Sequence, residues 1–268
     1  MLTANSSFWQ IMSLSGLPIL TYHSLDDSGS VISTSPATFE TQMKYLAQSG
    51  YQSLSLSEAT VFIRERKPFP EKAFVMTFDD GYQNNYTVAF PAMKEFGFKA
   101  TVFLISAYCG KSWSGGVYSL EARPMLSWSE IKEMHRYGVE FGAHTSTHPD
   151  LTRIPIDQAE REMAGSKTAI QDRLGAQVQS FAYPFGRLNA KVQEIARGQF
   201  SAACSTRLGK IEVADDPFSL KRIDMYYLSD FAVFSKLATT RLAWYLAFRQ
   251  VLRDVKSLSE QIPGLFVS

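Results

Sequence analysis

Long apolar runs are missing from this 268-residue sequence, in which no stretch reaches the roughly 18 apolar residues of an ordinary transmembrane helix. Residues 1–20 also lack a basic segment followed by an uninterrupted apolar run, which is the pattern of a secretory signal. We therefore expect a cytoplasmic protein, either free or at the membrane periphery. A periplasmic or extracellular location is expected instead if the natural chain has a leader that this sequence lacks.

Cysteines are scarce as well, and positive and negative charges nearly balance. The two cysteines, Cys109 and Cys204, are too few for a disulfide framework, and their spacing fits no metal motif. The formal net charge is +1 and no run of Lys or Arg occurs, so the sequence gives no electrostatic footprint for nucleic acid. With 45% hydrophobic and 13% aromatic residues, the chain can build the core of one large α/β domain.

The stretch around which the chain is organised is residues 73–82, AFVMTFDDGY. A run of apolar and β-branched residues that ends in glycine is typical of a buried strand in a parallel sheet. Asp79 and Asp80 follow this strand and should lie at its carboxyl end, where α/β barrels place their chemistry. Because strand side chains alternate between faces, two consecutive carboxylates are expected to do different jobs. The alternative is an ordinary turn.

Histidine is also rare, and two of the four histidines, His144 and His148, follow another strand-like run. Their four-residue spacing predicts one helical turn with both imidazoles on one face, able to grip one metal ion. Pro149 would stop a longer helix. With a carboxylate from residues 79–80, the pattern indicates a site of two histidines and one carboxylate, with open positions for water and substrate. The alternative is a capped turn without metal.

These motifs resemble those of the NodB-type polysaccharide deacetylases, carbohydrate esterase family 4. Thr77–Tyr82 (TFDDGY) is similar to the first motif of that family, and His144–His148 (HTSTH) is similar to the second. The third motif, usually Arg-x-Pro-Tyr, is matched in part by Ala182–Phe185. Upstream, Leu20–Ser24 resembles the Tyr-His element of the exopolysaccharide-associated subgroup. The resemblance extends over residues 17–225.

Predicted strands and helices alternate along most of the chain, which indicates βαβ units and a parallel sheet of seven or eight strands. The resemblance implies a distorted (β/α)7 TIM-like barrel. We expect this catalytic barrel over residues 1–228, with a long loop at 106–125 that covers a substrate cleft. Residues 229–268 predict a C-terminal helical extension with amphipathic, partly basic faces. It is expected to pack on the barrel, or alternatively to contact a membrane surface or a partner.

The resemblance also implies roles for individual residues. Asp80, His144 and His148 are the expected metal ligands, and Zn²⁺ suits two imidazoles and a carboxylate best, with Co²⁺ or Ni²⁺ as options. Asp79 corresponds to the general base, which takes a proton from the attacking water. The third-motif residues Tyr183, Pro184 and Phe185 are expected to line the cleft, with the backbone N–H of Phe185 helping to hold the oxyanion.

The catalytic acid follows from the histidines that remain. Many family members supply it from a C-terminal Leu-x-x-His motif, but no histidine follows His148 here. His23 lies in the Tyr-His element, where the exopolysaccharide subgroup has its acid, and histidine side chains exchange protons near neutral pH. His135 lies inside a predicted helix, where packing or surface exposure is expected.

Ala182 departs from the family pattern because it stands where an arginine usually pairs with the base. Arg222 and Asp224, at the end of the last predicted strand, offer a replacement charge or form an ordinary strand-end ion pair. Trp128 and Trp113 are candidates for stacking on a sugar, with core packing as the alternative.

These residues together predict a metal-dependent hydrolase that removes N-acetyl groups from N-acetylglucosamine-like units of an oligo- or polysaccharide or its precursor. Alternatives within the hydrolases are a deformylase or deacetylase of a lipid-linked sugar, and an O-deacetylase. An alternative outside the enzymes is a degenerate carbohydrate-binding barrel without activity.

Overall fold

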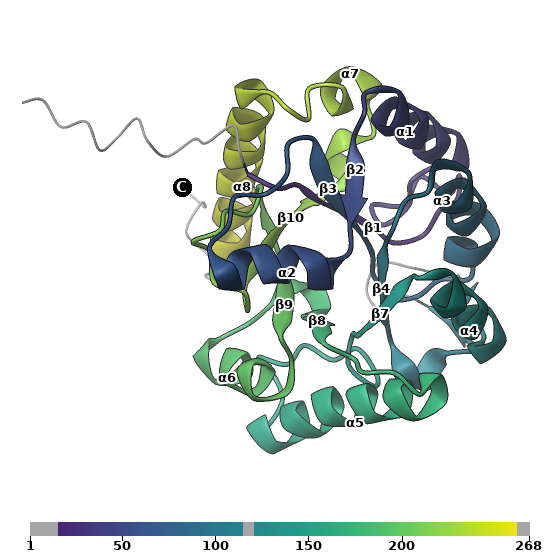
Figure 1. Cartoon of the computed structure of the whole chain (residues 1–268). Coiled ribbons are helices and arrows are strands. Elements are labelled where there is room, and N and C mark those ends of the chain that lie inside the picture. Colours follow the sequence, from purple (N-terminus) through teal and green to yellow (C-terminus); the bar gives the residue numbers. More distant parts are fainter. Residues whose placement is uncertain (1–15, 115–120, 262–268) are drawn as a thin grey trace, which may run out of the picture.

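Seven parallel strands close into a barrel in the computed structural model, which describes residues 16–114 and 121–261 (Figure 1). The ring runs in the order β1-β10-β9-β8-β7-β4-β3, and it closes because β1 pairs with both β3 and β10. This confirms the predicted (β/α)7 barrel. The ring strands are β1 (Ile19–Tyr22), β3 (Ala73–Phe78), β4 (Thr101–Leu104), β7 (Glu140–Ala143), β8 (Ser180–Ala182), β9 (Ala202–Leu208) and β10 (Leu220–Asp224).

The alternation of side chains along β3 decides which residues enter the barrel. Ala73 and Val75 belong to the cluster that fills the interior, whereas Phe74, Met76 and Phe78 pack outward against the helices. Strand β2 (Gln52–Leu54) stays outside the ring and pairs only with the first half of β3. Both faces of β3 are therefore buried, which is why it reads as a continuous apolar run.

Helices surround the ring, and one of them closes its amino-terminal end. The side chains of α2 (Leu56–Glu65) that face the barrel join the interior cluster, and Figure 1 shows α2 lying across the front of the strands. Two of the helices begin with capping boxes, in which Ser55 and Ser127 each exchange hydrogen bonds with the glutamate three residues on. The helices up to β9 are α1 (Pro36–Gln48), α2 (Leu56–Glu65), α3 (Phe90–Phe96), α4 (Trp128–Tyr137), α5 (Ile156–Leu174) and α6 (Ala190–Gln199).

Short elements fill the connections at the carboxyl end of the barrel. The long predicted loop contains a two-stranded hairpin, and a turn of π-helix precedes α3. These elements are η1 (Asn85–Ala89), η2 (Ser106–Tyr108), β5 (Ser112–Trp113), β6 (Arg123–Pro124), η4 (Pro184–Gly186) and η5 (Met225–Leu228).

The C-terminal extension consists of α7 (Phe231–Phe234) and α8 (Thr240–Gln261). Buried Leu242 and Leu246 pack α8 on the barrel, and Arg253 turns inward to donate a 2.8 Å hydrogen bond to the carbonyl of Thr206. The opposite face carries five large apolar side chains that are 45–63% exposed, namely Trp244, Phe248, Val251, Leu252 and Val255. No helix in the two described ranges is both long and apolar enough to cross a bilayer. Contact of α8 with a membrane surface stays a prediction, as does the boundary at residue 228.

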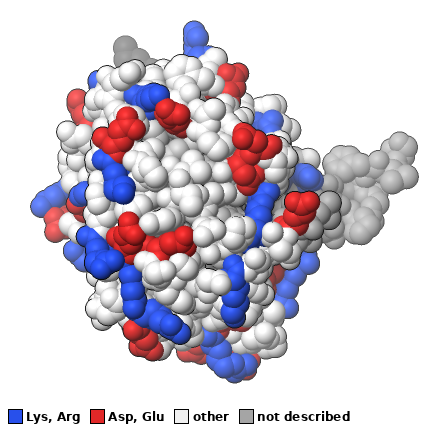
Figure 2. Space-filling model, turned by 90° about the vertical axis from the view of Figure 1, so that its right-hand side faces the viewer, with Lys and Arg blue, Asp and Glu red and all other residues white. Residues whose placement is uncertain are grey.

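The surface on the side of α1, α3 and α4 mixes charges of both signs. Figure 2 shows Lys and Arg interspersed with Asp and Glu around uncharged areas, without a broad patch of one sign. This face offers no basic stripe of the kind that follows a nucleic-acid backbone.

Gly142 in β7 tests how tightly the barrel interior is packed. A Cβ at this position would lie 2.5 Å from ring atoms of Phe103 and 2.7 Å from Ser180 Oγ. We expect Gly142→Ala to lower the free energy of unfolding by about 1–3 kcal/mol, because the core has no room for another methyl group. Gly198→Ala in α6 is the control: nothing lies within 4 Å of that Cβ, so it should be neutral or stabilising. Urea unfolding of both variants checks this, and equal effects would contradict the packing.

Candidate active site

Asp79 and Asp80 leave the carboxyl end of β3 in different directions. The strand ends at Phe78, and the backbone N–H of Asp79 still donates a 2.9 Å bond to the carbonyl of Tyr22 on β1. Asp79 thus continues the alternation of side chains along β3 on the same face as Val75, and its side chain points into the barrel. Asp80 has a φ of 72°, in the left-handed region, and its carboxylate turns toward the loop after β7. The two carboxylates therefore lie in different surroundings, and a difference in their roles stays a prediction.

Asp79 forms a buried two-pronged ion pair with Arg222 of β10. The two guanidinium nitrogens Nη1 and Nη2 donate to Oδ1 and Oδ2 at 2.7 Å each, and both side chains are at most 3% exposed. The Nε of Arg222 donates to the carbonyl of Ser205 at 2.8 Å, which fixes the orientation of the guanidinium. Burial by itself raises the pKa of Asp79, but the charge and hydrogen bonds of Arg222 outweigh it and hold that pKa well below its usual range. Arg222 thus provides the positive charge that is missing at position 182, where alanine stands in place of the usual arginine.

Asp80, His144 and His148 come together beside this pair. The Oδ1 of Asp80 lies 3.4 Å from Nε2 of His144 and 3.6 Å from Nε2 of His148, and the two Nε2 atoms are 3.2 Å apart. A tetrahedral centre with bonds of about 2.0–2.1 Å separates its donors by about 3.3 Å, so the three donor atoms fit one ion. The Nδ1 of His144 donates to the carbonyl of Ala182 at 2.7 Å, which fixes the ring so that Nε2 faces Asp80 and His148.

The pKa values of the two histidines shift in opposite directions. Burial, followed by the nearby charge of His144, lowers the pKa of His148 to about 4, so this imidazole is neutral at pH 7. Burial also lowers the pKa of His144, but the hydrogen bond to Asp80 and the charges of Asp79 and Asp80 outweigh it, and the net shift is upward. A cation placed among these residues would take over the attraction that the aspartates now give to a proton.

The segment from His144 to His148 is an irregular loop, so the predicted helical turn is wrong. Thr145 and His148 both have a φ of 66°, and the hydroxyl of Thr145 accepts a 2.9 Å bond from the N–H of His148. Two left-handed residues fold the chain back, so the imidazoles meet without a helix. Glu162 of α5 also contacts this loop, and no sequence motif predicted that contact.

His23 lies directly after β1 and beside the base candidate. Its Nε2 is 3.9 Å from Oδ2 of Asp79, and its side chain is 18% exposed. Asn85 donates a 2.8 Å bond to the backbone carbonyl of His23, which anchors that loop. His135 instead lies partly buried in α4, with Nδ1 3.3 Å from the carbonyl of Val139, and does not join the cluster.

The third-motif turn contributes one side chain to the cluster. Phe185 has a φ of 59°, and its ring centroid lies 4.7 Å from that of His148. Pro184 is buried next to it. Tyr183 is fully buried, and its hydroxyl donates a 3.0 Å bond to the carbonyl of Phe218. Phe185 lines the site with its side chain, therefore, and Tyr183 does not.

Of the two tryptophan candidates, Trp113 of β5 lies at the site, with its ring centroid 5.0 Å from that of His148. Trp128 begins α4 and packs against the core below the guanidinium of Arg173. Asp224 accepts a 3.0 Å bond from the N–H of Tyr226 and caps η5. Neither Trp128 nor Asp224 joins the cluster.

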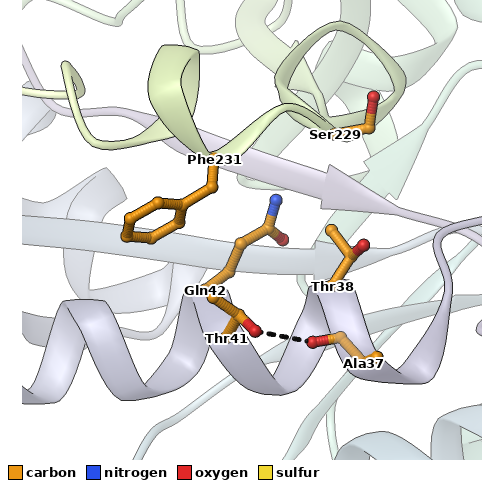
Figure 3. A pocket seen from close by; sticks show the side chains of 6 residues that line it. All are labelled: Ala37, Thr38, Thr41, Gln42, Ser229 and Phe231. Carbon is orange, nitrogen blue, oxygen red and sulfur yellow. Dashed lines mark hydrogen bonds between the residues drawn. The ribbon is translucent and has the colours of Figure 1, made fainter.

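A cavity of about 210 Å³ lies elsewhere, between α1 and the segment before α7 (Figure 3). Its polar groups already have partners within the protein. Thr41 donates to the carbonyl of Ala37 at 2.9 Å, and Gln42 bridges the hydroxyl of Tyr22 and the carbonyl of Leu228. This cavity therefore offers little to a polar ligand.

Comparison with known proteins agrees with the fold and the site. A family model for polysaccharide deacetylase matches residues 66–199. YxkH of Bacillus subtilis (strain 168) is 33% identical over 208 residues, which span 77% of this chain and 70% of that protein. The structure of IcaB from Ammonifex degensii has a TM-score of 0.73 at 27% identity, over 85% of this chain and 97% of that one. The deacetylase PplD of Streptococcus pyogenes, solved with acetate, has a TM-score of 0.68 at 28% identity, over 78% and 92%.

The barrel and the cluster at its carboxyl end thus define a carbohydrate-acting hydrolase. The chain belongs to the polysaccharide deacetylase family, with homologues of the IcaB exopolysaccharide type. The Escherichia coli (strain K12) poly-β-1,6-N-acetyl-D-glucosamine N-deacetylase is 29% identical over 138 residues, but these cover 48% of this chain and only 20% of that protein. The Staphylococcus aureus (strain MSSA476) protein of the same name is 28% identical over 169 residues, which cover 55% of its length.

Replacing Arg222 with glutamine tests the buried ion pair. The substitution leaves the Asp79 carboxylate buried without its cation, so we expect the free energy of unfolding at pH 7 to fall by about 3–5 kcal/mol. The pKa of Asp79 is lower in the folded chain than in the unfolded one. The pair therefore stabilises the folded state fully at pH values above the pKa of about 3.9 that Asp79 has in the unfolded chain. The difference in the free energy of unfolding between wild type and variant should therefore shrink as the pH falls toward and below about 4.

The matched control is Arg197→Gln, which breaks the surface pair of Arg197 with Asp216. Both of those side chains are more than a third exposed, so we expect a loss of at most about 1 kcal/mol. Urea unfolding between pH 3 and 7 measures both variants. A small, pH-independent loss for Arg222→Gln would contradict the assignment.

Proposed function

We propose that this protein is a metal-dependent hydrolase that removes N-acetyl groups from hexosamine units of a polysaccharide or its precursor. The observation that carries the proposal is that the two adjacent aspartates have different partners. Asp79 is buried against Arg222 and next to His23, and Asp80 lies with His144 and His148. A base, an acid and three metal-binding donors thus meet at one end of the barrel.

Asp80, His144 and His148 are the residues that would hold the ion. Two imidazole nitrogens and one carboxylate oxygen suit Zn²⁺, and Co²⁺ or Ni²⁺ accept the same donors. When bound, such an ion supplies Lewis acidity, which makes a water more acidic and polarises a carbonyl group.

The remaining chemistry belongs to side chains of the protein. Asp79, kept ionised by Arg222, accepts a proton from the attacking water, whose oxygen bonds to the carbonyl carbon of the N-acetyl group. His23 gives a proton to the sugar nitrogen as the C–N bond breaks, so the products are acetate and a free amine. The backbone N–H of Phe185 stabilises the charge that develops on the carbonyl oxygen. Trp113 and Phe185 shield the side of His148 from water.

The names of the Escherichia coli and Staphylococcus aureus relatives support β-1,6-linked N-acetylglucosamine as the first substrate to test. Because these relatives are longer than the aligned segments, their substrate is a proposal for this chain. The same residues would also serve an acetyl ester or a lipid-linked sugar, which are kept as second substrates. A degenerate carbohydrate-binding barrel without activity is the alternative outside the enzymes.

The experiment is acetate release from oligomers of N-acetylglucosamine with β-1,4 and β-1,6 linkages, before and after chelation. We expect about one divalent ion per chain, activity that disappears on chelation, and recovery when Zn²⁺ or Co²⁺ is added. An acetylated xylan oligomer serves as the ester control. A metal-loaded protein that releases acetate only from the ester would overturn N-deacetylation. A protein that binds no metal would overturn the proposal as a whole.

A further inference from the structure

The loop that carries His144 and His148 is held from the side by one carboxylate, Glu162 of α5. Its Oε2 accepts hydrogen bonds from the backbone N–H groups of Ser146 and Thr147, at 2.9 Å each. Its Oε1 accepts a 2.8 Å bond from the hydroxyl of Thr147. Three donors from two consecutive loop residues thus converge on a single side chain.

Other contacts make α5 a firm support for this loop. The hydroxyl of Ser146 donates to the backbone carbonyl of Glu162 at 3.3 Å. Gly165, one turn further along α5, allows the close approach, because a Cβ there would lie 3.2 Å from Ser146 Oγ. On the opposite side, the N–H of Ala107 donates to the carbonyl of Ser146 at 3.0 Å. The loop is therefore fixed between α5 and η2.

The loop needs such support because its backbone is strained. Thr145 and His148 both occupy the left-handed region, which costs of order 1 kcal/mol for a non-glycine residue. Hydrogen bonds to an ionised acceptor are about twice as strong as neutral ones, so a carboxylate can keep the loop in this conformation. Without it, Ser146 and Thr147 would be free to relax, and His148 would move away from Asp80.

We propose that Glu162 is a positioning residue for the metal site, which sets the affinity for the ion by holding His148 at its distance from Asp80. This inference rests on the proposed function, because it assumes that an ion binds Asp80, His144 and His148. Glu162 itself does not contact the reacting atoms. Its effect passes through the backbone of Ser146 and Thr147, and the sequence separation from His148 hides it from motif analysis.

The test compares Glu162→Gln, Glu162→Ala and the control Glu160→Gln by metal binding. Glu160 is on the same helix, is exposed, and makes no hydrogen bond to the loop, so its substitution removes the same charge without the contact. We expect Glu162→Ala to weaken the affinity for Zn²⁺ by about 10–100-fold, as is typical when a residue that orients a ligand is removed. Glu162→Gln keeps one acceptor and should fall between this and wild type, and Glu160→Gln should bind as wild type does.

The readouts are chelator competition for Zn²⁺ and the visible absorption spectrum of the Co²⁺-loaded protein, with thermal unfolding of the metal-free form alongside. A merely structural role would lower the unfolding temperature of the Glu162 variants and leave both metal readouts at wild-type values, and that result would overturn the inference. Failure of the wild-type protein to bind metal would instead overturn the proposed function, and this inference with it. Altered Co²⁺ spectra in the Glu162 variants, but not in Glu160→Gln, would support it.

Discussion

The buried ion pair between Asp79 and Arg222 is the interaction on which the site depends. Two charges at most 3% exposed are tolerated only because the geometry is two-pronged and the remaining guanidinium nitrogen is bonded to the backbone. The pair joins β3 to β10, two strands that do not pair directly and are linked through β1. Closure of the barrel is therefore what gives Asp79 its partner.

The same pair separates the roles of two adjacent carboxylates. Asp79 follows the alternation of β3 into the interior and is held ionised there. Asp80 breaks that alternation with its left-handed backbone and joins the histidines instead. One backbone dihedral thus gives the two carboxylates different surroundings, although both belong to the same Asp-Asp-Gly turn. The histidine loop depends on a comparable backbone distortion, which Glu162 stabilises from the neighbouring helix.

Much of this arrangement could be predicted from the sequence, because its signals are local. The apolar run before Asp79 indicated the strand, and the spacing of His144 and His148 indicated a shared ligand site. The helical turn predicted for that spacing was wrong, because left-handed φ values at Thr145 and His148 leave no periodic signal. Arg222 was predicted, with Asp224, either to replace the charge missing at Ala182 or to form an ordinary strand-end ion pair, since only the closed barrel shows which residue pairs with Asp79. Glu162 gave no signal at all, because its contact with the loop depends on how α5 packs.

The central claim is that Asp79 acts as the base while Asp80 binds the ion, and one measurement tests it most directly. The metal content of Asp79→Asn and Asp80→Asn, purified alongside the wild-type protein, is compared with their rates of acetate release. The account predicts that Asp79→Asn keeps about one ion per chain and loses activity by at least about 10²-fold, whereas Asp80→Asn loses the ion. Loss of the ion from Asp79→Asn, or its retention at full affinity in Asp80→Asn, would contradict the account.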